Sequence, residues 1–255
     1  MVRLENVTVS YRQHPALHHV SGHIAAGSLT AVVGPNGSGK STLLKSMLGL
    51  VPLAGGQLRV DLPRQRIAYL PQQSDIDRSF PMSVQDCVLL GCWPASGAWG
   101  RVDQAQRASV AQALGRVQLQ GFEQRPLGAL SAGQLQRVLL ARLLVQEGDL
   151  ILLDEPFNAV DARTTEALLT LLAQWQQQQR TVVAVVHDNA LVRAYFPNTL
   201  VLARQVVALG DTALALTPAN LLRAGAMAEA WDEDADLCHA DADADADAAL
   251  SETRR

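Results

Sequence analysis

The stretch Gly34-Pro35-Asn36-Gly37-Ser38-Gly39-Lys40-Ser41 decides the fold, because a short apolar run (28–33) precedes it and a helix-forming run (41–50) follows it. Glycines let such a loop curl until successive N–H groups point inward, and the helix adds the partial positive charge of its first turn. Lys40 would neutralise phosphate charge, and the Ser41 hydroxyl would take one position on Mg²⁺. The pattern predicts a phosphate-binding loop made of Gly34, Pro35, Asn36, Gly37, Ser38, Gly39, Lys40, Ser41 and Thr42.

A second motif, Leu150-Ile151-Leu152-Leu153-Asp154-Glu155, runs from four apolar residues into two carboxylates. A buried strand can carry such groups only at its end, where they meet solvent or a metal ion. Asp154 is expected to hold Mg²⁺, directly or through water, and Glu155 to orient and deprotonate the water that attacks a phosphate. Alone, the motif would be read as a polar strand end that turns at Pro156; its place after a phosphate-binding loop favours the catalytic interpretation.

Strand-like and helical runs alternate over most of the chain. Strands are expected at 2–10, 20–24, 28–33, 57–60, 66–70, 150–153 and 181–186, and helices at 41–50 and 164–178. The first two strands alternate apolar and polar residues, as in a small antiparallel sheet, whereas the later ones are largely apolar, as in a buried parallel sheet. The segment 81–146 has a helical pattern, with Ser83 as N-cap and a loop rich in Gly and Trp at 91–100. These runs predict an α/β domain over residues 1–230, with an N-terminal antiparallel β subdomain and an α-helical subdomain inserted at about 82–146.

Charge is distributed unevenly along the 255 residues. The formal net charge is −4, but nine of the 25 acidic and two of the 21 basic residues follow Trp231, which leaves 16 acids and 19 bases before it. Residues 231–255, rich in alternating Asp and Ala, are expected to be a disordered acidic tail. No run of about 18 uncharged apolar residues occurs, and the first residues carry charge, so we expect a cytoplasmic location.

The segment Leu130-Ser131-Ala132-Gly133-Gln134, followed by Leu135-Gln136-Arg137, resembles the signature of ATP-binding-cassette proteins. With the two motifs above, the resemblance covers about residues 2–215. It implies a P-loop NTPase core that binds and hydrolyses ATP with Mg²⁺, and a helical subdomain that carries the signature. In this family each ATP lies between the phosphate loop of one subunit and the signature of the other, which implies a two-fold homodimer. Nucleotide contacts are then expected from Ser131, Ala132, Gly133 and Gln134.

Four further residues match positions of the family. Tyr11 matches an aromatic residue that stacks on adenine, although a strand aromatic would explain it equally well. Gln72 resembles the glutamine that touches Mg²⁺ and the attacking water and senses the membrane partner. Asp161, in Asn158-Ala159-Val160-Asp161, resembles the acid of the loop that joins the two subunits, and His187 resembles the switch histidine that contacts the γ-phosphate.

One departure from the family pattern concerns Ala132, where the family usually has glycine. Alanine keeps its backbone N–H, so a phosphate contact survives if the backbone there is helical. A positive φ at this residue would cost about 1 kcal/mol or more. We expect an altered rate or affinity at most, and not the loss of ATPase activity.

The stretches 70–84 and 155–161 resemble ATPase subunits of zinc and manganese importers, with ATPases of ferric-siderophore or haem importers as the alternative. The resemblance implies integral membrane permease subunits as partners, an extracytoplasmic solute-binding protein acting through them, and a position on the inner face of the cell membrane. Aromatic residues supply large contact areas at low entropic cost, so Phe80, Trp93 and Trp99 are candidate anchors for the permease, with ordinary packing as the equal alternative.

Other functional classes fit the sequence less well. A soluble, non-transport cassette ATPase usually has a coiled-coil insertion or two cassettes in one chain, and a nucleic-acid partner is not expected. A regulator without turnover would not need Glu155, Gln72 and His187 together, and a GTPase would need an Asn-Lys-x-Asp motif that is missing. Neither the early histidines, His14, His18, His19 and His23, nor the pair Cys238-His239 has a recognisable metal-ligand spacing.

Overall fold

The computed structural model describes residues 1–12, 14–93 and 102–230. Trp99, the pair Cys238-His239 and the predicted acidic tail lie outside the described residues. No helix in the described part of the chain combines the length and the apolar character that crossing a membrane requires.

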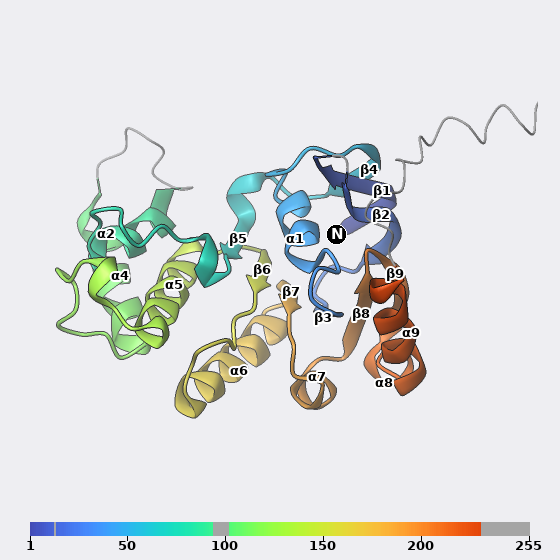
Figure 1. Ribbon diagram of the computed structural model, residues 1–255. Coiled ribbons are helices and arrows are strands. Elements are labelled where there is room, and N and C mark those ends of the chain that lie inside the picture. The colour runs from blue at the N-terminus through green and yellow to red at the C-terminus, as the bar shows by residue number, and fades with distance from the viewer. Residues whose placement is uncertain (13, 94–101, 231–255) are drawn as a thin grey trace, which may run out of the picture.

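A six-stranded sheet forms the centre of the molecule, in the order β5-β6-β7-β3-β8-β9 (Figure 1). The strands β3, β5, β6, β7 and β8 run parallel, and β9 pairs antiparallel with β8 at one edge. Their bounds are β3 (Leu29–Val33), β5 (Ile67–Leu70), β6 (Leu150–Asp154), β7 (Thr181–Val185), β8 (Asn198–Ala203) and β9 (Gln205–Asp211). This arrangement confirms the predicted α/β core, with the correction that one edge strand is antiparallel.

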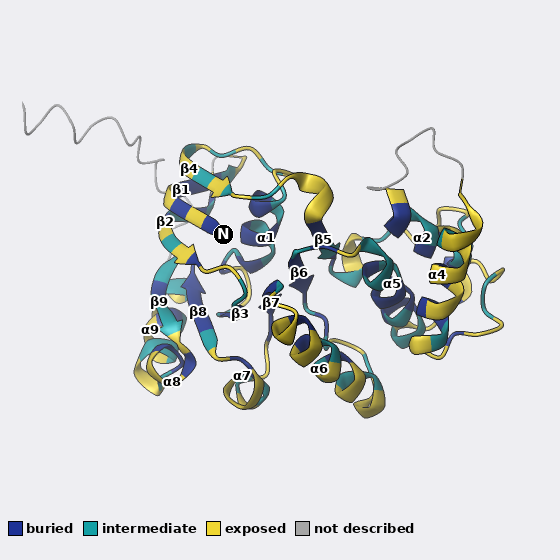
Figure 2. Ribbon diagram, turned by 180° about the vertical axis from the view of Figure 1, so that it is seen from behind, coloured by how far each residue is buried: buried dark blue, intermediate teal, exposed yellow. Residues whose placement is uncertain are grey.

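Both faces of the central sheet are covered, which explains why its strands are apolar without alternation (Figure 2). Alternate residues of β6 show this division. Leu150 and Leu152 belong to one hydrophobic cluster, with the helix α1 (Lys40–Met47) and the N-terminal sheet. Ile151 and Leu153 belong to the other, with α5 (Ala132–Gln146) and α6 (Ala162–Gln177).

The N-terminal segment forms the predicted antiparallel sheet, in the order β2-β1-β4. Its strands are β1 (Val2–Tyr11), β2 (His14–Ile24) and β4 (Gly55–Val60). Val2 pairs with Ile24 on one side and with Val60 on the other, and all four core-facing residues of β1 (Val2, Leu4, Val7 and Val9) are buried. The sheet packs over α1, directly after the phosphate-binding loop.

Helices dominate between β5 and β6, on the side of the molecule away from the N-terminal sheet (Figure 1). They are α2 (Val84–Leu89), α4 (Gln104–Arg116) and α5, with the 3₁₀ turns η2 (Gln73–Asp75), η3 (Leu90–Cys92) and η4 (Leu127–Ala129); a further turn, η1 (Arg64–Arg66), precedes β5. The predicted N-cap Ser83 accepts a hydrogen bond from the Asp86 N–H. Phe80 and Trp93 are 57% and 52% exposed, so neither predicted anchor is buried in packing.

The C-terminal part contains elements that we did not predict from the sequence. They are β8, β9, α7 (Asn189–Tyr195), α8 (Thr212–Ala215) and α9 (Pro218–Glu229). Thr217 caps α9 and Pro218 opens it, a helix-start signal that the sequence does contain. The helix predicted at 164–178 begins earlier, at Ala162, because Asp161 is its N-cap.

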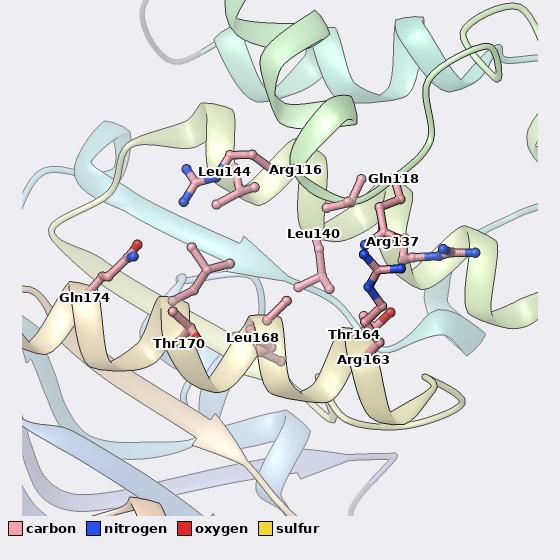
Figure 3. A pocket seen from close by; sticks show the side chains of 13 residues that line it. Arg116, Gln118, Arg137, Leu140, Leu144, Arg163, Thr164, Leu168, Thr170 and Gln174 are labelled. Atoms are coloured by element: carbon pink, nitrogen blue, oxygen red, sulfur yellow. The ribbon is translucent and has the colours of Figure 1, made fainter.

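A cavity of about 260 Å³ lies between α5, the end of α4 and α6 (Figure 3). Leucines from both helices form its walls, among them Leu140 and Leu144 of α5 and Leu168 of α6. Three arginines lie around it, Arg116, Arg137 and Arg163. The two helices therefore do not interlock along this stretch.

Stability should depend on the apolar residues of β6. Leu152 is fully buried between β5 and β7, so Leu152→Ala should lower the free energy of unfolding by about 2–5 kcal/mol. Urea unfolding would measure the change. The matched control is Leu214→Ala, because Leu214 is 78% exposed on α8, and its effect should stay within about 0.5 kcal/mol. Equal effects of the two substitutions would contradict the assignment of β6 to the core.

Candidate active site

The carboxyl ends of four adjacent strands meet at one edge of the central sheet. In the order β5-β6-β7-β3, these ends lead into Gln72, Asp154-Glu155, His187 and Gly34. Ligands of open parallel sheets bind outside this edge, since the loops that follow the strands converge there. Four segments that are distant in sequence are thus brought together. A cavity of about 610 Å³ lies at this edge, lined by Asn36, Gln72, Glu155, Phe157, Asn158, Val185, Val186, His187 and Asp188.

Two glycines of the phosphate-binding loop have no room for a side chain. A Cβ on Gly34 would lie 2.0 Å from the Leu202 carbonyl oxygen, and one on Gly39 would lie 2.3 Å from that of Ala16. The φ of Gly39 is also +90°, which other residues adopt only at a cost. Gly37 (φ +73°) instead has open space around it. The loop is therefore pressed against β8 and β2 on one side and free on the other.

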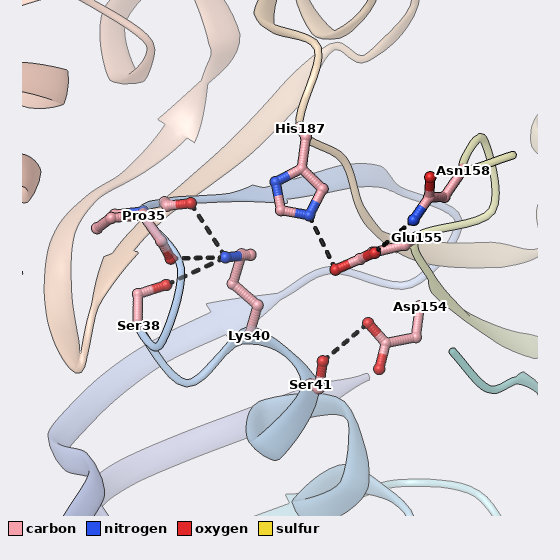
Figure 4. Close-up of polar contacts among 9 residues, drawn as sticks. Pro35, Ser38, Lys40, Ser41, Asp154, Glu155, Asn158 and His187 are labelled. Carbon is pink, nitrogen blue, oxygen red and sulfur yellow. Dashed lines mark hydrogen bonds and ion pairs between the residues drawn. The ribbon is translucent and has the colours of Figure 1, made fainter. Parts of the chain in front are cut away.

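Lys40 is only 6% exposed, and its ammonium group lies inside the loop (Figure 4). Its Nζ donates hydrogen bonds to the carbonyl oxygens of Gly34 and Pro35, at 3.0 and 2.7 Å, and lies 3.5 Å from the Ser38 hydroxyl. Burial lowers the pKa of Lys40, while the carboxylates of Glu155 and Asp154 oppose that shift. A buried cation beside a ring of backbone N–H groups suits the binding of phosphate oxygens.

Asp154 is fully buried and is bonded on one side only. Its Oδ1 accepts a hydrogen bond of 3.0 Å from the Ser41 hydroxyl, while its Oδ2 is buried without a partner among the described residues. Burial raises its pKa to about 6, and the Ser41 hydrogen bond only partly offsets this. A free carboxylate oxygen next to a hydroxyl is the donor set that a hard cation such as Mg²⁺ prefers. The residues present therefore fit a magnesium ion.

Glu155 is the centre of a small hydrogen-bond network (Figure 4). Its Oε1 lies 2.9 Å from Nε2 of His187, and its Oε2 accepts a hydrogen bond of 3.2 Å from the Asn158 amide. The Gln72 side chain is a further partner. Burial would raise the pKa of Glu155, but these hydrogen bonds and His187 bring it below its ordinary value. Glu155 is therefore ionised at neutral pH and can accept a proton.

The signature segment lies at the N-terminus of α5. Ser131 is the N-cap, and Ser131 and Gln134 form a capping box in which each side chain accepts a hydrogen bond from the other residue's N–H. Ala132 is the first helical residue and has no positive φ, so its N–H keeps the geometry of a helix N-terminus. Gly133 has a different constraint, because a Cβ there would lie 3.0 Å from the Ala159 carbonyl oxygen.

The remaining predicted residues lie around this site without joining the network of Glu155. Thr42 is half-buried in α1, directly after Ser41. Tyr11 is 46% exposed at the end of β1 and is close enough to Lys45 of α1 to influence its pKa. Asp161 accepts a 2.7 Å hydrogen bond from the Thr164 N–H as the N-cap of α6. Within this chain Asp161 therefore caps and stabilises the N-terminus of α6.

The structure adds residues that sequence reasoning did not assign to the site. Asn158 was expected only to be part of the loop 158–161, but its side chain donates a hydrogen bond to Glu155. Lys45 forms an ion pair of 2.9 Å with Asp75, which ties α1 to the segment after Gln72. Of the early histidines, His18 and His19 contact each other, and no cluster of three or more His, Cys, Asp or Glu side chains suited to a metal occurs among the described residues.

Comparison with known proteins places these features in context. Residues 17–158 match a family model described as ABC transporter. The chain is 42% identical over 214 residues to the manganese transport system ATP-binding protein MntB of Listeria monocytogenes, covering 82% of this chain and 89% of that protein. It is 42% identical over 228 residues to the zinc transport system ATP-binding protein TroB of Treponema pallidum, covering 88% and 86%.

Solved structures show the same architecture. A transporter described as of metal-chelate type, in an inward-facing conformation, superposes with a TM-score of 0.75 at 32% identity, covering 88% of each chain. The dimeric structure of MJ0796, a bacterial ABC transporter cassette, superposes with a TM-score of 0.73 at 27% identity, covering 83% of this chain and 99% of that one. These superpositions agree with the predicted core and inserted helical region.

The raised pKa of Asp154 makes the stability depend on pH. Its ordinary value is 3.8 and its folded value about 6, so between these values the folded chain holds a proton that the unfolded chain has released. The contribution of Asp154 to the free energy of unfolding should therefore fall as pH rises through this window, by about 1.4 kcal/mol per unit at most. Urea unfolding without divalent cations, at several pH values between 4 and 7, would show this slope in the wild type. Asp154→Asn should remove it; an unchanged slope would contradict the assignment.

Proposed function

The chain belongs to the ABC transporter family, and from this premise we propose that it is the ATP-hydrolysing subunit of an importer for manganese or zinc ions. The family assignment makes it an ATPase. The proposed cargo is supported by relatives at about 40% identity that are named manganese or zinc transport system ATP-binding proteins. The observation that carries the proposal is the convergence of Lys40, Asp154, Glu155 and His187 at one edge of the sheet.

ATP would bind with its phosphates in the loop of residues 34–42. Lys40 and the backbone N–H groups would hold the β- and γ-phosphates, and Tyr11 would stack on the adenine. Ser41, Asp154 and Gln72 would hold Mg²⁺, which neutralises charge on the phosphate oxygens when it is bound. The unpartnered oxygen of Asp154 supports this donor set.

Glu155 would take the proton of the attacking water. Its lowered pKa keeps it ionised at neutral pH, and its contacts with His187, Asn158 and Gln72 fix the direction of its carboxylate. His187, which is 45% exposed, would contact the γ-phosphate through a ring N–H. The residues that hydrolyse ATP would therefore all lie at this edge of the sheet. The nucleotide site would still lack the contacts of the signature segment.

Those contacts would come from a second copy of the chain. Ser131 caps α5, which lies beyond β5 and β6 as seen from α1 and the phosphate-binding loop in both views (Figures 1 and 2). One chain would therefore have difficulty presenting both surfaces to the same nucleotide. We infer a homodimer with two shared ATP sites, in which Ser131, Ala132, Gly133, Gln134 and Asp161 act across the interface. The dimeric cassette MJ0796 supports this arrangement.

The integral membrane partner would be a permease. Exposed Phe80, between η2 and α2, and exposed Trp93, directly after η3, offer aromatic anchors for its cytoplasmic helices. A solute-binding protein outside the membrane would act through that permease, and the chain would sit on the inner face of the cell membrane. A ferric-siderophore or haem importer is the alternative that the sequence leaves open.

Replacing the proposed base should separate binding from hydrolysis. Glu155→Gln removes the proton acceptor but keeps the shape of the side chain, so kcat should fall at least about a hundredfold while Mg·ATP still binds. Nucleotide binding and light scattering should then show a dimer that persists with ATP. Glu166→Gln makes the same chemical change at an exposed position of α6 and should leave kcat unchanged. Normal turnover by Glu155→Gln would refute the assignment of the base.

The cargo can be tested with the chain and its permease reconstituted together in lipid vesicles, with this chain facing the lumen. ATP inside the vesicles should drive uptake of Mn²⁺ or Zn²⁺ from outside, and Glu155→Gln should abolish it. Ferric siderophore and haem serve as competing cargoes in parallel vesicles. Uptake of either chelate without uptake of free Mn²⁺ or Zn²⁺ would contradict the proposed cargo.

A further inference from the structure

Gln136 is a buried polar residue of α5 to which the proposed function gives no role. Its side chain is 1% exposed and its amide makes two hydrogen bonds. The oxygen Oε1 accepts from Nε2 of Gln73 at 2.9 Å, and Nε2 donates to the carbonyl oxygen of Pro156 at 3.2 Å. A buried amide bonded at both ends holds its partners in fixed relative positions, because breaking either bond leaves a buried polar group unsatisfied.

Both partners of Gln136 are chain neighbours of active-site residues. Gln73 follows Gln72, and Pro156 follows Glu155. The side chains of Gln72 and Glu155 line the same cavity, and Gln72 contributes to the lowered pKa of Glu155. Gln73, Gln136 and Pro156 therefore join the two segments on one side, in a ring whose other side is the pair of facing side chains of Gln72 and Glu155. The relative position of Gln72 and Glu155 is thus held through Gln136.

Glu155 is sensitive to the position of the Pro156 carbonyl. Its φ is +52°, and the turn that follows is closed by a hydrogen bond of 3.1 Å from the Asn158 N–H to the Glu155 carbonyl oxygen. Pro156 lies inside this tight turn, so a displacement of its carbonyl would rotate the backbone that carries the Glu155 side chain. A shift of even about 1 Å at a reacting group can cost about a hundredfold in rate.

Few polar contacts join α5 to α6. The cavity between the two helices extends from Arg137 to Leu144, which leaves part of their facing surfaces out of contact (Figure 3). Within the described residues, the bond from Gln136 to Pro156 is the only hydrogen bond from α5 to residues 150–177. The same helix begins at Ser131, which caps its N-terminus.

We propose that Gln136 is a positioning residue for ATP hydrolysis, which holds Gln72 and Glu155 at their working separation and makes that separation depend on the orientation of the signature helix. It touches neither the nucleotide loop nor the predicted metal ligand Asp154. The inference rests on the catalytic role proposed for Glu155 and is independent of which ion is transported.

The test is Gln136→Met, which keeps the volume of the side chain and removes both hydrogen bonds. In steady-state assays of the purified chain, kcat should fall about tenfold, the loss expected when a hydrogen bond that orients a catalytic group is removed. The KM for Mg·ATP should stay within about twofold, because Lys40, Ser41 and Asp154, to which Gln136 makes no hydrogen bond, would still hold Mg·ATP. Gln112→Met, at an exposed position of α4, is the matched control and should match the wild type in both constants.

A second variant distinguishes positioning from a general loss of structure. Gln73→Met removes only one bond of the ring, so it should also lower kcat, and the double variant Gln73→Met/Gln136→Met should be no slower than Gln136→Met. If Gln136→Met does not fold, Gln73→Met alone must show the loss of kcat at constant KM. A kcat within about twofold of wild type for the folded variants, or additive losses in the double variant, would overturn the inference. Glu155→Gln is assayed alongside these variants. Normal turnover by Glu155→Gln would refute the proposed function itself. An inactive Glu155→Gln together with a normal Gln136→Met would refute only the inference.

Discussion

The burial of the Asp154 carboxylate is the constraint around which the rest of the site is arranged. A charged group without solvent exposure is costly unless other groups compensate it, and the chain supplies only partial compensation, from the Ser41 hydroxyl and from Lys45. The carboxyl therefore has a raised pKa and one unsatisfied oxygen. A hard cation would satisfy that oxygen, and its charge would in turn attract the phosphate groups held by the neighbouring loop. Lys40 faces the same problem with the opposite sign, since burial lowers its pKa and the carboxylates of Glu155 and Asp154 oppose the shift. The buried charges of Asp154 and Lys40 are thus each costly without a ligand, and a bound magnesium nucleotide would compensate both.

The structure explains why the signature tolerates alanine at one position and has glycine at the next. Ala132 is the first residue of α5, with helical backbone, so its methyl group requires no unusual φ. Gly133 faces the carbonyl oxygen of Ala159, at a distance where a Cβ would need its neighbour to shift. The loop of residues 158–161 is itself held close by the contacts of Asn158 with Glu155. The glycine at 133 therefore follows from packing between two functional loops, whereas Ala132 depends only on helix geometry.

Local patterns predicted the elements that carry the chemistry, and they failed where structure depends on distant partners. The strand before Gly34 and the strand that ends in Asp154 are apolar over their whole length, so both were visible in the sequence. The strands β8 and β9 were missed although β8 is equally buried, because no motif marks its end and β9 is half exposed at the sheet edge. Ser41 and Asp154 could be assigned to one ion from the chemistry of their motifs. The bond between His187 and Glu155 and the contacts of Gln136 could not, since each joins segments whose approach is set by the order of strands in the sheet.

The segment 72–78 connects more parts of this site than any single motif suggests. Gln72 reaches Glu155, Gln73 reaches Gln136 on α5, and Asp75 pairs with Lys45 on the helix that follows the phosphate-binding loop. Arg78 donates to the carbonyl oxygen of Leu130, next to the residue that caps the signature helix. The exposed Phe80 follows directly, so a partner that moves it would pull on a segment tied to the nucleotide loop, the base and the signature at once. Because hydrogen bonds and ion pairs of this kind have discrete arrangements, a small movement there has few ways to be absorbed locally. A displacement of this segment would therefore be shared among the contacts that join it to Lys45, Gln136 and Leu130.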